Sequence, residues 1–181
     1  DGAVILSRPV RAIINREDGV EVAVDGGILR ASYVIVSSAF PALSKITVEA
    51  PLSPLQRTAI AQLPYTQILQ LHLSAETPFW ESDGLSPSMW TDGPIERIFP
   101  QRDLSGAITS LTAWINGTGA EALAGQSDAA LADLVKAEMT RLRPASEGKI
   151  NLLKAVRWTR DANPTGGAYM HWAPGQAPIW A

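Results

Sequence analysis

The sequence predicts an α+β protein in which a β-meander at the start of the chain is followed by a mixed sheet with helices. Two stretches, residues 20–25 and 67–75, alternate apolar and polar side chains with the period of half-buried strands. Residues 127–144 instead carry apolar side chains at helical spacing. Between these patterns, residues 33–54 change from a strand to turns and a helix start, which we interpret as a crossing between two domains.

The first part of the chain reads as a three-stranded meander. Residues 4–6 and 10–15 are extended and rich in apolar side chains, and Asp18-Gly19 is a strong hairpin signal. Gly26-Gly27 marks a second turn, after which residues 28–36 form the return strand. Because this strand ends on Val34-Ile35-Val36, we expect its end to be buried on both faces.

The crossing contains several breaks in regular structure. Phe40 precedes a proline and is therefore disfavoured in a helix, so the chain must turn there. A short extended piece follows at residues 46–48. Ser53 is a suitable N-cap with Pro54 at the first helical position, and Leu55, Ala59 and Leu63 then share one stripe, which predicts a helix over residues 53–63.

The strand over residues 67–75 has two distinct faces. Leu69, Leu71 and Leu73 point to one side, where we expect a core. Gln70 and His72 point to the other side, where we expect a cleft.

The rest of the second part is predicted as short strands and one long helix. The strands cover residues 89–91, 98–99, 108–115 and 150–158. Ser127 caps the helix and Pro144 closes it. Its apolar stripe consists of Leu131, Leu134, Val135, Met139 and Leu142. A loop rich in glycine and proline spans residues 163–178.

Composition excludes several classes of function. A net charge of −3 gives no basic surface for nucleic acid. The chain has no cysteine, so disulfides, thiolate ligands and cysteine nucleophiles are ruled out. Its two histidines stand far apart without a spaced carboxylate cluster, so we expect no metal site. No apolar run approaches the ~18 residues of a membrane span, and there is no signal peptide, so we expect a cytoplasmic protein.

One glycine motif invites a phosphate-binding interpretation. The run from Gly117 to Ala122 fits G-x-G-x-x-A and follows a strand. Gly125 interrupts the helix that should follow, and a new cap occurs at Ser127. We therefore favour a plain connection between a strand and a helix.

The order of several short motifs resembles the flavin-containing amine oxidase family, the monoamine oxidase-like flavoproteins. The motifs are the crossing over residues 33–54, Arg8-Pro9-Val10, Pro78-Phe79-Trp80, and Trp158 followed by Gly166-Gly167-Ala168-Tyr169. The resemblance covers nearly the whole chain but only the later-middle part of such an enzyme. With no initiator methionine and an abrupt end at Ala181, we expect a fragment of a longer protein.

The resemblance implies a domain organisation. Residues 1–59 would be the β-meander and crossover of a Rossmann-like FAD-binding domain. Residues 60–161 would be a substrate-binding domain, and residues 162–181 would return toward the FAD-binding domain. The family's dinucleotide fingerprint does not occur in the sequence, so we expect residues 1–181 alone to be inactive and to bind no stoichiometric FAD.

The resemblance also implies which residues lie near the cofactor. Val10 would offer its backbone to the adenine end of FAD, although it could equally be an ordinary strand residue. Gly166, Gly167 and Ala168 would approach the flavin ring. Ala168 stands where some members carry a cysteine tethered to the flavin, so the FAD of this protein would be bound noncovalently.

Three residues are implied to act in catalysis: Gln70, Tyr169 and Trp158. Gln70 stands where the family usually has a lysine near flavin N5, so the charge is lost while hydrogen bonding is retained. Tyr169 would form one wall of an aromatic cage, and Trp158 would pack near the ring system. The alternatives are a solvated glutamine, a core tyrosine and a core tryptophan. His72 is a candidate acid or base, although a lone histidine on a strand is more often structural.

The leading hypothesis is part of an FAD-dependent oxidoreductase that oxidises a C–N or C–H bond by hydride transfer to flavin. One alternative is a flavin desaturase or dehydrogenase of a large apolar substrate. Another is a non-catalytic binding or interaction module. The expected partners are a small amine or apolar substrate and a second copy in a homodimer, without nucleic acid or membrane.

Overall fold

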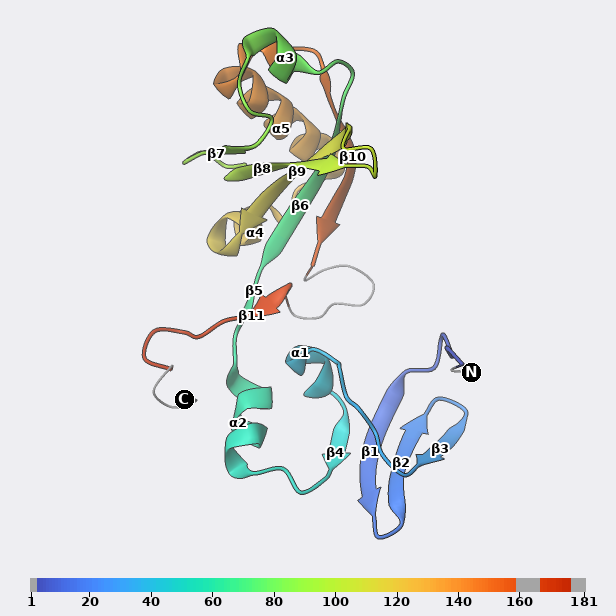
Figure 1. Ribbon diagram of the computed structural model, residues 1–181. Helices are drawn as coiled ribbons and strands as arrows, with labels where there is room; N and C mark the ends of the chain where they lie inside the picture. The colour runs from blue at the N-terminus through green and yellow to red at the C-terminus, as the bar shows by residue number, and fades with distance from the viewer. Residues whose placement is uncertain (1–2, 159–166, 177–181) are drawn as a thin grey trace. The chain divides into compact units, whose positions relative to one another are not determined.

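The computed structural model describes residues 3–158 and 167–176, and it confirms the α+β class. The described chain forms two compact units (Figure 1). The first comprises the residues up to Tyr65 together with those from Met170 onward, and the second runs from Thr66 to Tyr169.

The first unit is built on a four-stranded sheet with the order β3-β2-β1-β4. The strands are β1 (Val10–Arg16), β2 (Gly19–Val24), β3 (Gly27–Ala31) and β4 (Thr47–Glu49). The first three pair antiparallel as the predicted meander, and β4 pairs parallel with β1. Gly19 has φ +150°, and a Cβ there would lie 2.5 Å from the carbonyl oxygen of Ala31, so the predicted hairpin needs glycine at this position.

The prediction of a strand buried on both faces at Val34-Ile35-Val36 is wrong. The return strand β3 ends at Ala31, and Ile35 is 96% exposed without belonging to any strand. A strand is buried on both faces only when it pairs inside a covered sheet, and residues 34–36 join no described sheet. Residues 4–6, expected to be extended, are likewise exposed and outside any strand.

Two short helices follow the meander. Helix α1 (Phe40–Leu43) includes Phe40, so the expectation that Phe40 is disfavoured in a helix is wrong, because Pro41 lies in the first turn, where proline is tolerated. Helix α2 (Pro54–Gln62) confirms the predicted cap, because Ser53 and Gln56 form a reciprocal capping box. No residue of α2 is buried, and Leu55 is 50% exposed, so its apolar stripe does not face a core within the described residues.

The second unit is built on a five-stranded antiparallel sheet with the order β10-β6-β9-β8-β7. Its strands are β6 (Ile68–Ala75), β7 (Met89–Trp90), β8 (Arg97–Arg102), β9 (Ile108–Asn116) and β10 (Ile150–Arg157). The mixed sheet therefore belongs to the first unit, whereas the sequence placed it in the second.

Helices cover one face of this sheet. They are α3 (Phe79–Asp83), α4 (Gly117–Leu123) and α5 (Asp128–Leu142), followed by a 3-10 turn, η1 (Pro144–Ser146). Figure 1 shows α5 running along the sheet, with which it shares one hydrophobic core. The core includes the predicted inward residues Leu69, Leu71 and Leu73 of β6 and the predicted stripe residues Leu131, Val135 and Met139 of α5.

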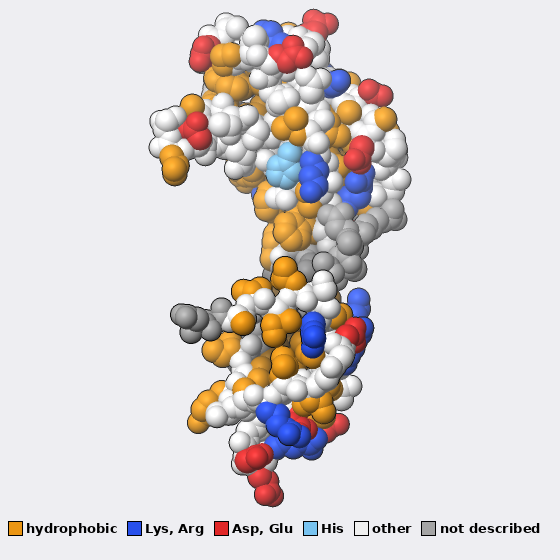
Figure 2. Space-filling model, turned by 90° about the vertical axis from the view of Figure 1, so that its right-hand side faces the viewer, with side chains coloured by type: hydrophobic (Ala, Val, Ile, Leu, Met, Phe, Trp, Pro, Cys, Tyr) orange, Lys and Arg blue, Asp and Glu red, His pale blue; other side chains and the backbone are white. Residues whose placement is uncertain are grey.

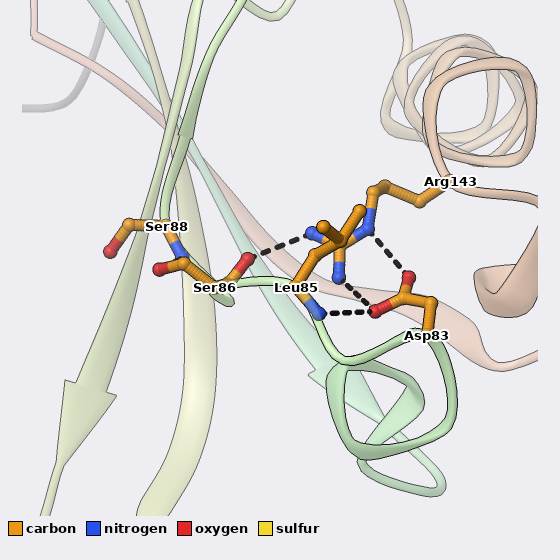
Figure 3. A network of polar contacts seen from close by, with 5 residues as sticks. All are labelled: Asp83, Leu85, Ser86, Ser88 and Arg143. Carbon is orange, nitrogen blue, oxygen red and sulfur yellow. Dashed lines mark hydrogen bonds and ion pairs between the residues drawn. The ribbon is translucent and has the colours of Figure 1, made fainter.

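A buried ion pair joins α3 to the end of α5 (Figure 3). The Arg143 side chain is 6% exposed and donates two hydrogen bonds to Asp83, at 2.6 and 2.7 Å. It also donates to the carbonyl oxygen of Ser86 and lies 5.1 Å from the ring centre of Phe79. This network ties the loop after α3 to the closing turn of α5.

Two further strands, β5 (Tyr65–Thr66) and β11 (Tyr169–Met170), pair with each other. On the face drawn in Figure 2, exposed hydrophobic side chains lie among acidic and basic ones. Within the described residues, no helix has the length and apolarity needed to cross a membrane.

Candidate functional site

The face of the five-stranded sheet opposite α5 carries a pocket of about 640 Å³. Strand register explains its composition, because Gln70 pairs with Trp114 and His72 pairs with Thr112, so all four point to the same side. The pairing of Phe99 with Thr112 adds β8 to this face. The pocket is lined by Gln70, His72, Arg97, Phe99, Gln101, Thr112, Trp114 and Tyr169. The predicted division of β6 into a core face and a cleft face is thus confirmed.

The side chains of Gln70 and Trp158 are joined at one edge of the pocket. Trp158 Nε1 donates a hydrogen bond of 3.0 Å to Gln70 Oε1, and the backbone of Trp158 donates to Ile68. The indole therefore fixes the orientation of the amide. The Gln70 Nε2 hydrogens have no partner among the described residues, so this donor remains open to a ligand.

Asn116 holds two aromatic side chains of the pocket. Its Oδ1 accepts hydrogen bonds from Trp114 Nε1 at 3.0 Å and from the Tyr169 hydroxyl at 3.4 Å. Phe99 packs edge-to-face against Trp114, with ring centres 6.4 Å apart. These contacts preset the aromatic wall before any ligand binds.

Glu96 anchors Asn116 in turn. Its carboxylate accepts hydrogen bonds from the backbone and the side chain of Asn116, at 3.1 and 2.8 Å. Glu96 has φ +47°, a left-handed conformation that is uncommon and costly for a glutamate. A Cβ at Gly119 would lie 2.9 Å from Glu96 Oε1, so glycine there makes room for the carboxylate.

The floor of the pocket holds a second polar group. Thr112 is 2% exposed, and its hydroxyl lies 3.3 Å from His72 Nδ1 and accepts a 3.3 Å hydrogen bond from Gln101 Nε2. This contact fixes the imidazole of His72 on the pocket face of β6.

The remaining predicted site residues are distributed differently. Gly167 is buried, and Ala168 donates its N–H to Thr66, just before Tyr169 enters the pocket. Gly166 lies outside the described residues. Val10 begins β1 in the other unit, next to an irregularity in the pairing of β1 with β2. The structure thus places Gln70 and Tyr169 in the lining of one pocket, and Trp158 is hydrogen-bonded to Gln70.

Sequence reasoning missed Arg97, Phe99, Trp114, Asn116 and Glu96. The signal that could have found them is the alternation along residues 97–101 and 110–116, aligned with the alternation of β6. The glycine motif forms α4, a short helix directly after β9, as expected for a plain connection. No three His, Asp or Glu side chains in the described part of the chain lie close enough to hold a metal ion.

Chemically, the pocket offers an aromatic wall, an open amide donor, an imidazole and one guanidinium. Its lining includes no carboxylate among the described residues. Such a surface suits a flat or aromatic molecule that also accepts hydrogen bonds.

Residues 1–180 match the model of a family described as flavin containing amine oxidoreductase. The chain is 27% identical over 175 residues to an L-amino-acid oxidase of Mus musculus, covering 92% of this chain but 28% of that protein. Among solved structures, a triple mutant of putrescine oxidase from a redesign of cofactor binding aligns with TM-score 0.74 at 25% identity, covering 91% of this chain and 37% of that one. Cyclohexylamine oxidase from Brevibacterium oxydans IH-35A shares the fold, with TM-score 0.77 at 18% identity over 92% of this chain and 37% of that one.

Proposed function

The chain belongs to the family of flavin containing amine oxidoreductases, and on this premise we propose that its second unit supplies the substrate pocket of an FAD-dependent oxidoreductase. The reaction is oxidation of a C–N bond in a small amine. The observation that carries the proposal is that Gln70 and Tyr169 line one pocket, with Trp158 hydrogen-bonded to Gln70. Because the chain spans 28% of its mouse relative, the activity is proposed for the flavin-loaded protein that contains this chain.

The pocket edge fits a flat heteroaromatic ring. Gln70 presents amide hydrogens that have no partner in the described part of the chain, and flavin rings carry nitrogen and oxygen acceptors. Trp158 is 38% exposed and Tyr169 is 47% exposed, so both rings can pack against a ligand. When bound, FAD supplies an acceptor for a hydride equivalent from the carbon beside the amine nitrogen.

The residues of this chain contribute positioning. The aromatic wall aligns the substrate and keeps water away from the reacting bond. Tyr169 presents a ring face to a cationic amine, an attraction of ~0.5–2 kcal/mol. With no cysteine to form a thioether, this chain would hold FAD noncovalently. Five polar side chains line the pocket, which does not favour the alternative of a large apolar substrate.

Stopped-flow kinetics of the two half-reactions in the flavin-loaded protein test this proposal. Tyr169→Ala should slow flavin reduction by the amine while flavin absorbance shows that the cofactor stays bound. Tyr169→Phe keeps the ring and loses only the hydrogen bond to Asn116, so it serves as the matched control.

Gln70→Lys should alter the oxidative half-reaction more than the reductive one. If Tyr169→Ala and Gln70→Lys both left both rates within about twofold, a change of ~0.4 kcal/mol in barrier, the site assignment would be abandoned.

A further inference from the structure

A small pocket lies where the second half of α5 meets the turn before β10. Its volume is about 80 Å³, and it shares no lining residue with the substrate pocket on the other face of the sheet. Two of its lining residues stand one turn apart on α5, and the others come from η1, the following turn and the start of β10. The lining consists of Lys136, Thr140, Ser146, Gly148, Ile150 and Asn151.

Ser146 provides the observation that points to a ligand. The residue is 1% exposed, and its Oγ has no hydrogen-bond partner among the described residues. A buried hydroxyl without a hydrogen bond is costly, and folded proteins rarely contain one. Because Ser146 lines the pocket, a molecule bound there would supply the missing partner.

Other polar groups of the pocket are donors that also lack an acceptor in the described part of the chain. The Thr140 hydroxyl forms no hydrogen bond there, unlike that of Thr58 in α2, which donates to the carbonyl oxygen of Pro54. The N–H of Gly148 has no backbone acceptor within the described ranges. Lys136 is exposed and forms no ion pair with a described carboxylate.

This set of donors matches a small anion. An ammonium group offers three donors and a full positive charge, and each hydroxyl and backbone N–H offers one donor more. No aspartate or glutamate belongs to the lining, as far as the chain is described. The pocket equals about two or three water molecules in volume, so it admits a small ion or one end of a larger molecule. A phosphate group combines up to two negative charges with several strong acceptor oxygens, so a single group can accept from all these donors.

We propose that this pocket binds a phosphate group, either as the free ion or as the end of a phosphorylated small molecule. Lys136 supplies the charge, and Thr140, Ser146 and the N–H of Gly148 supply hydrogen bonds. The inference goes beyond the proposed function and does not depend on it. A bound phosphate would connect α5 to the turn before β10, so it should also stabilise the second unit.

The first test titrates the 181-residue chain with inorganic phosphate at constant ionic strength and follows the amide chemical shifts of residues 146–151 by NMR. We expect these resonances to shift and to saturate. Lys136→Gln removes the charge and should weaken binding about tenfold or more. Lys154→Gln makes the same change at an exposed site of β10 outside the lining, so it is the matched control and should stay within about twofold of the parent.

A second test uses Ser146→Ala to distinguish bound phosphate from bound water. Without phosphate, the variant loses a hydroxyl that lacks a protein partner, so its melting temperature should be no lower than that of the parent. With phosphate, the melting temperature should rise clearly more for the parent than for Ser146→Ala. Phosphate also stabilises proteins by exclusion from their surface, but that effect is shared by the parent, Ser146→Ala and Lys154→Gln. A variant that is less stable without phosphate and binds it as the parent does would show a hydroxyl satisfied by water and would overturn the proposal.

Two further ligands identify the source of the phosphate group. Glycerol 3-phosphate that binds as tightly as inorganic phosphate would support a phosphorylated small molecule as the ligand, whereas weaker binding would support the free ion. Acetate offers two acceptor oxygens and one charge, so we expect it to bind far more weakly than either. Acetate binding equal to that of phosphate, no binding of either phosphate compound by the parent, or binding that survives Lys136→Gln unchanged would refute the site.

Discussion

At the scale of single residues, Leu71 shows how the alternation of apolar and polar side chains along β6 contributes to the stability of the protein. Its side chain is 0% exposed in the core between the sheet and α5. Leu71→Ala removes buried methyl groups and leaves a cavity, so we expect the free energy of unfolding to fall by about 2–5 kcal/mol. Chemical denaturation measures this change. Leu153→Ala, at a site 61% exposed on the neighbouring strand, is the control and should stay within ~0.5 kcal/mol of the parent. Similar losses for the two variants would mean that the core is not where the structure places it.

The Arg143–Asp83 pair predicts a dependence of stability on pH. Hydrogen bonds from the Arg143 side chain hold the pKa of the Asp83 carboxyl below its usual value of 3.8. The unfolded chain therefore takes up this proton first as the pH falls. The pair's contribution is fully present above the unfolded pKa and is lost as the pH falls through the lower folded pKa. We expect the stability difference between the parent and Asp83→Asn, measured by denaturation from about pH 7 to about pH 3, to shrink at the acid end.

The same network predicts a contrast between two neighbouring arginines. Arg143→Met removes hydrogen bonds from a site where the parent side chain is 6% exposed, and it leaves Asp83 without its partner. Arg141→Met removes an ion pair whose arginine side chain is 62% exposed and screened by solvent. We expect the melting temperature to fall clearly more for Arg143→Met. Equal shifts would contradict a structural role for the network in Figure 3.

At the scale of elements, helix α5 depends on its first turn. Ser127 accepts a hydrogen bond of 3.2 Å from the N–H of Ala130, which satisfies one of the free donors at the start of the helix. Ser127→Ala should lower the free energy of unfolding by about 0.5–2 kcal/mol, measured by thermal or chemical denaturation. Ser127→Asp restores a capping oxygen and should recover most of the loss. Failure of the aspartate to rescue would indicate that the serine acts through another contact.

The elements also show where sequence patterns suffice. Period-two alternation predicted β6 and its two faces, and the helical stripe predicted α5, because each pattern records which side chains meet a core. The prediction for Val34-Ile35-Val36 failed because an apolar run predicts burial but does not identify the strand that would cover it, and no described strand pairs with these residues. Only some of the residues at the pocket were predicted from the sequence, for a related reason. Gln70 could be placed on a cleft, whereas Arg97 and Asn116 join it only through the register between strands distant in sequence.

At the scale of the whole molecule, the two units differ in how much apolar surface they bury. Every member of the main core cluster comes from the second unit. In the first unit, the buried hydrophobic side chains among the described residues are Ile13, Val24 and Leu43, each 8 or 9% exposed. Burial of apolar surface supplies most of the stability of a domain, so the second unit should resist opening far more strongly.

Hydrogen exchange measured by mass spectrometry tests this difference. We expect the amides of β6 and β9 to exchange much more slowly than those of β1 and β2. Both pairs of strands are hydrogen-bonded, but the exchange rate reports the free energy of opening the structure and not the hydrogen bond alone. Leu71→Ala should then accelerate exchange in β6 and β9 and leave β1 and β2 unchanged, since its cavity lies in the second unit's core. Equal protection in all four strands, with equal acceleration by the variant, would mean that the two units open together as one cooperative body.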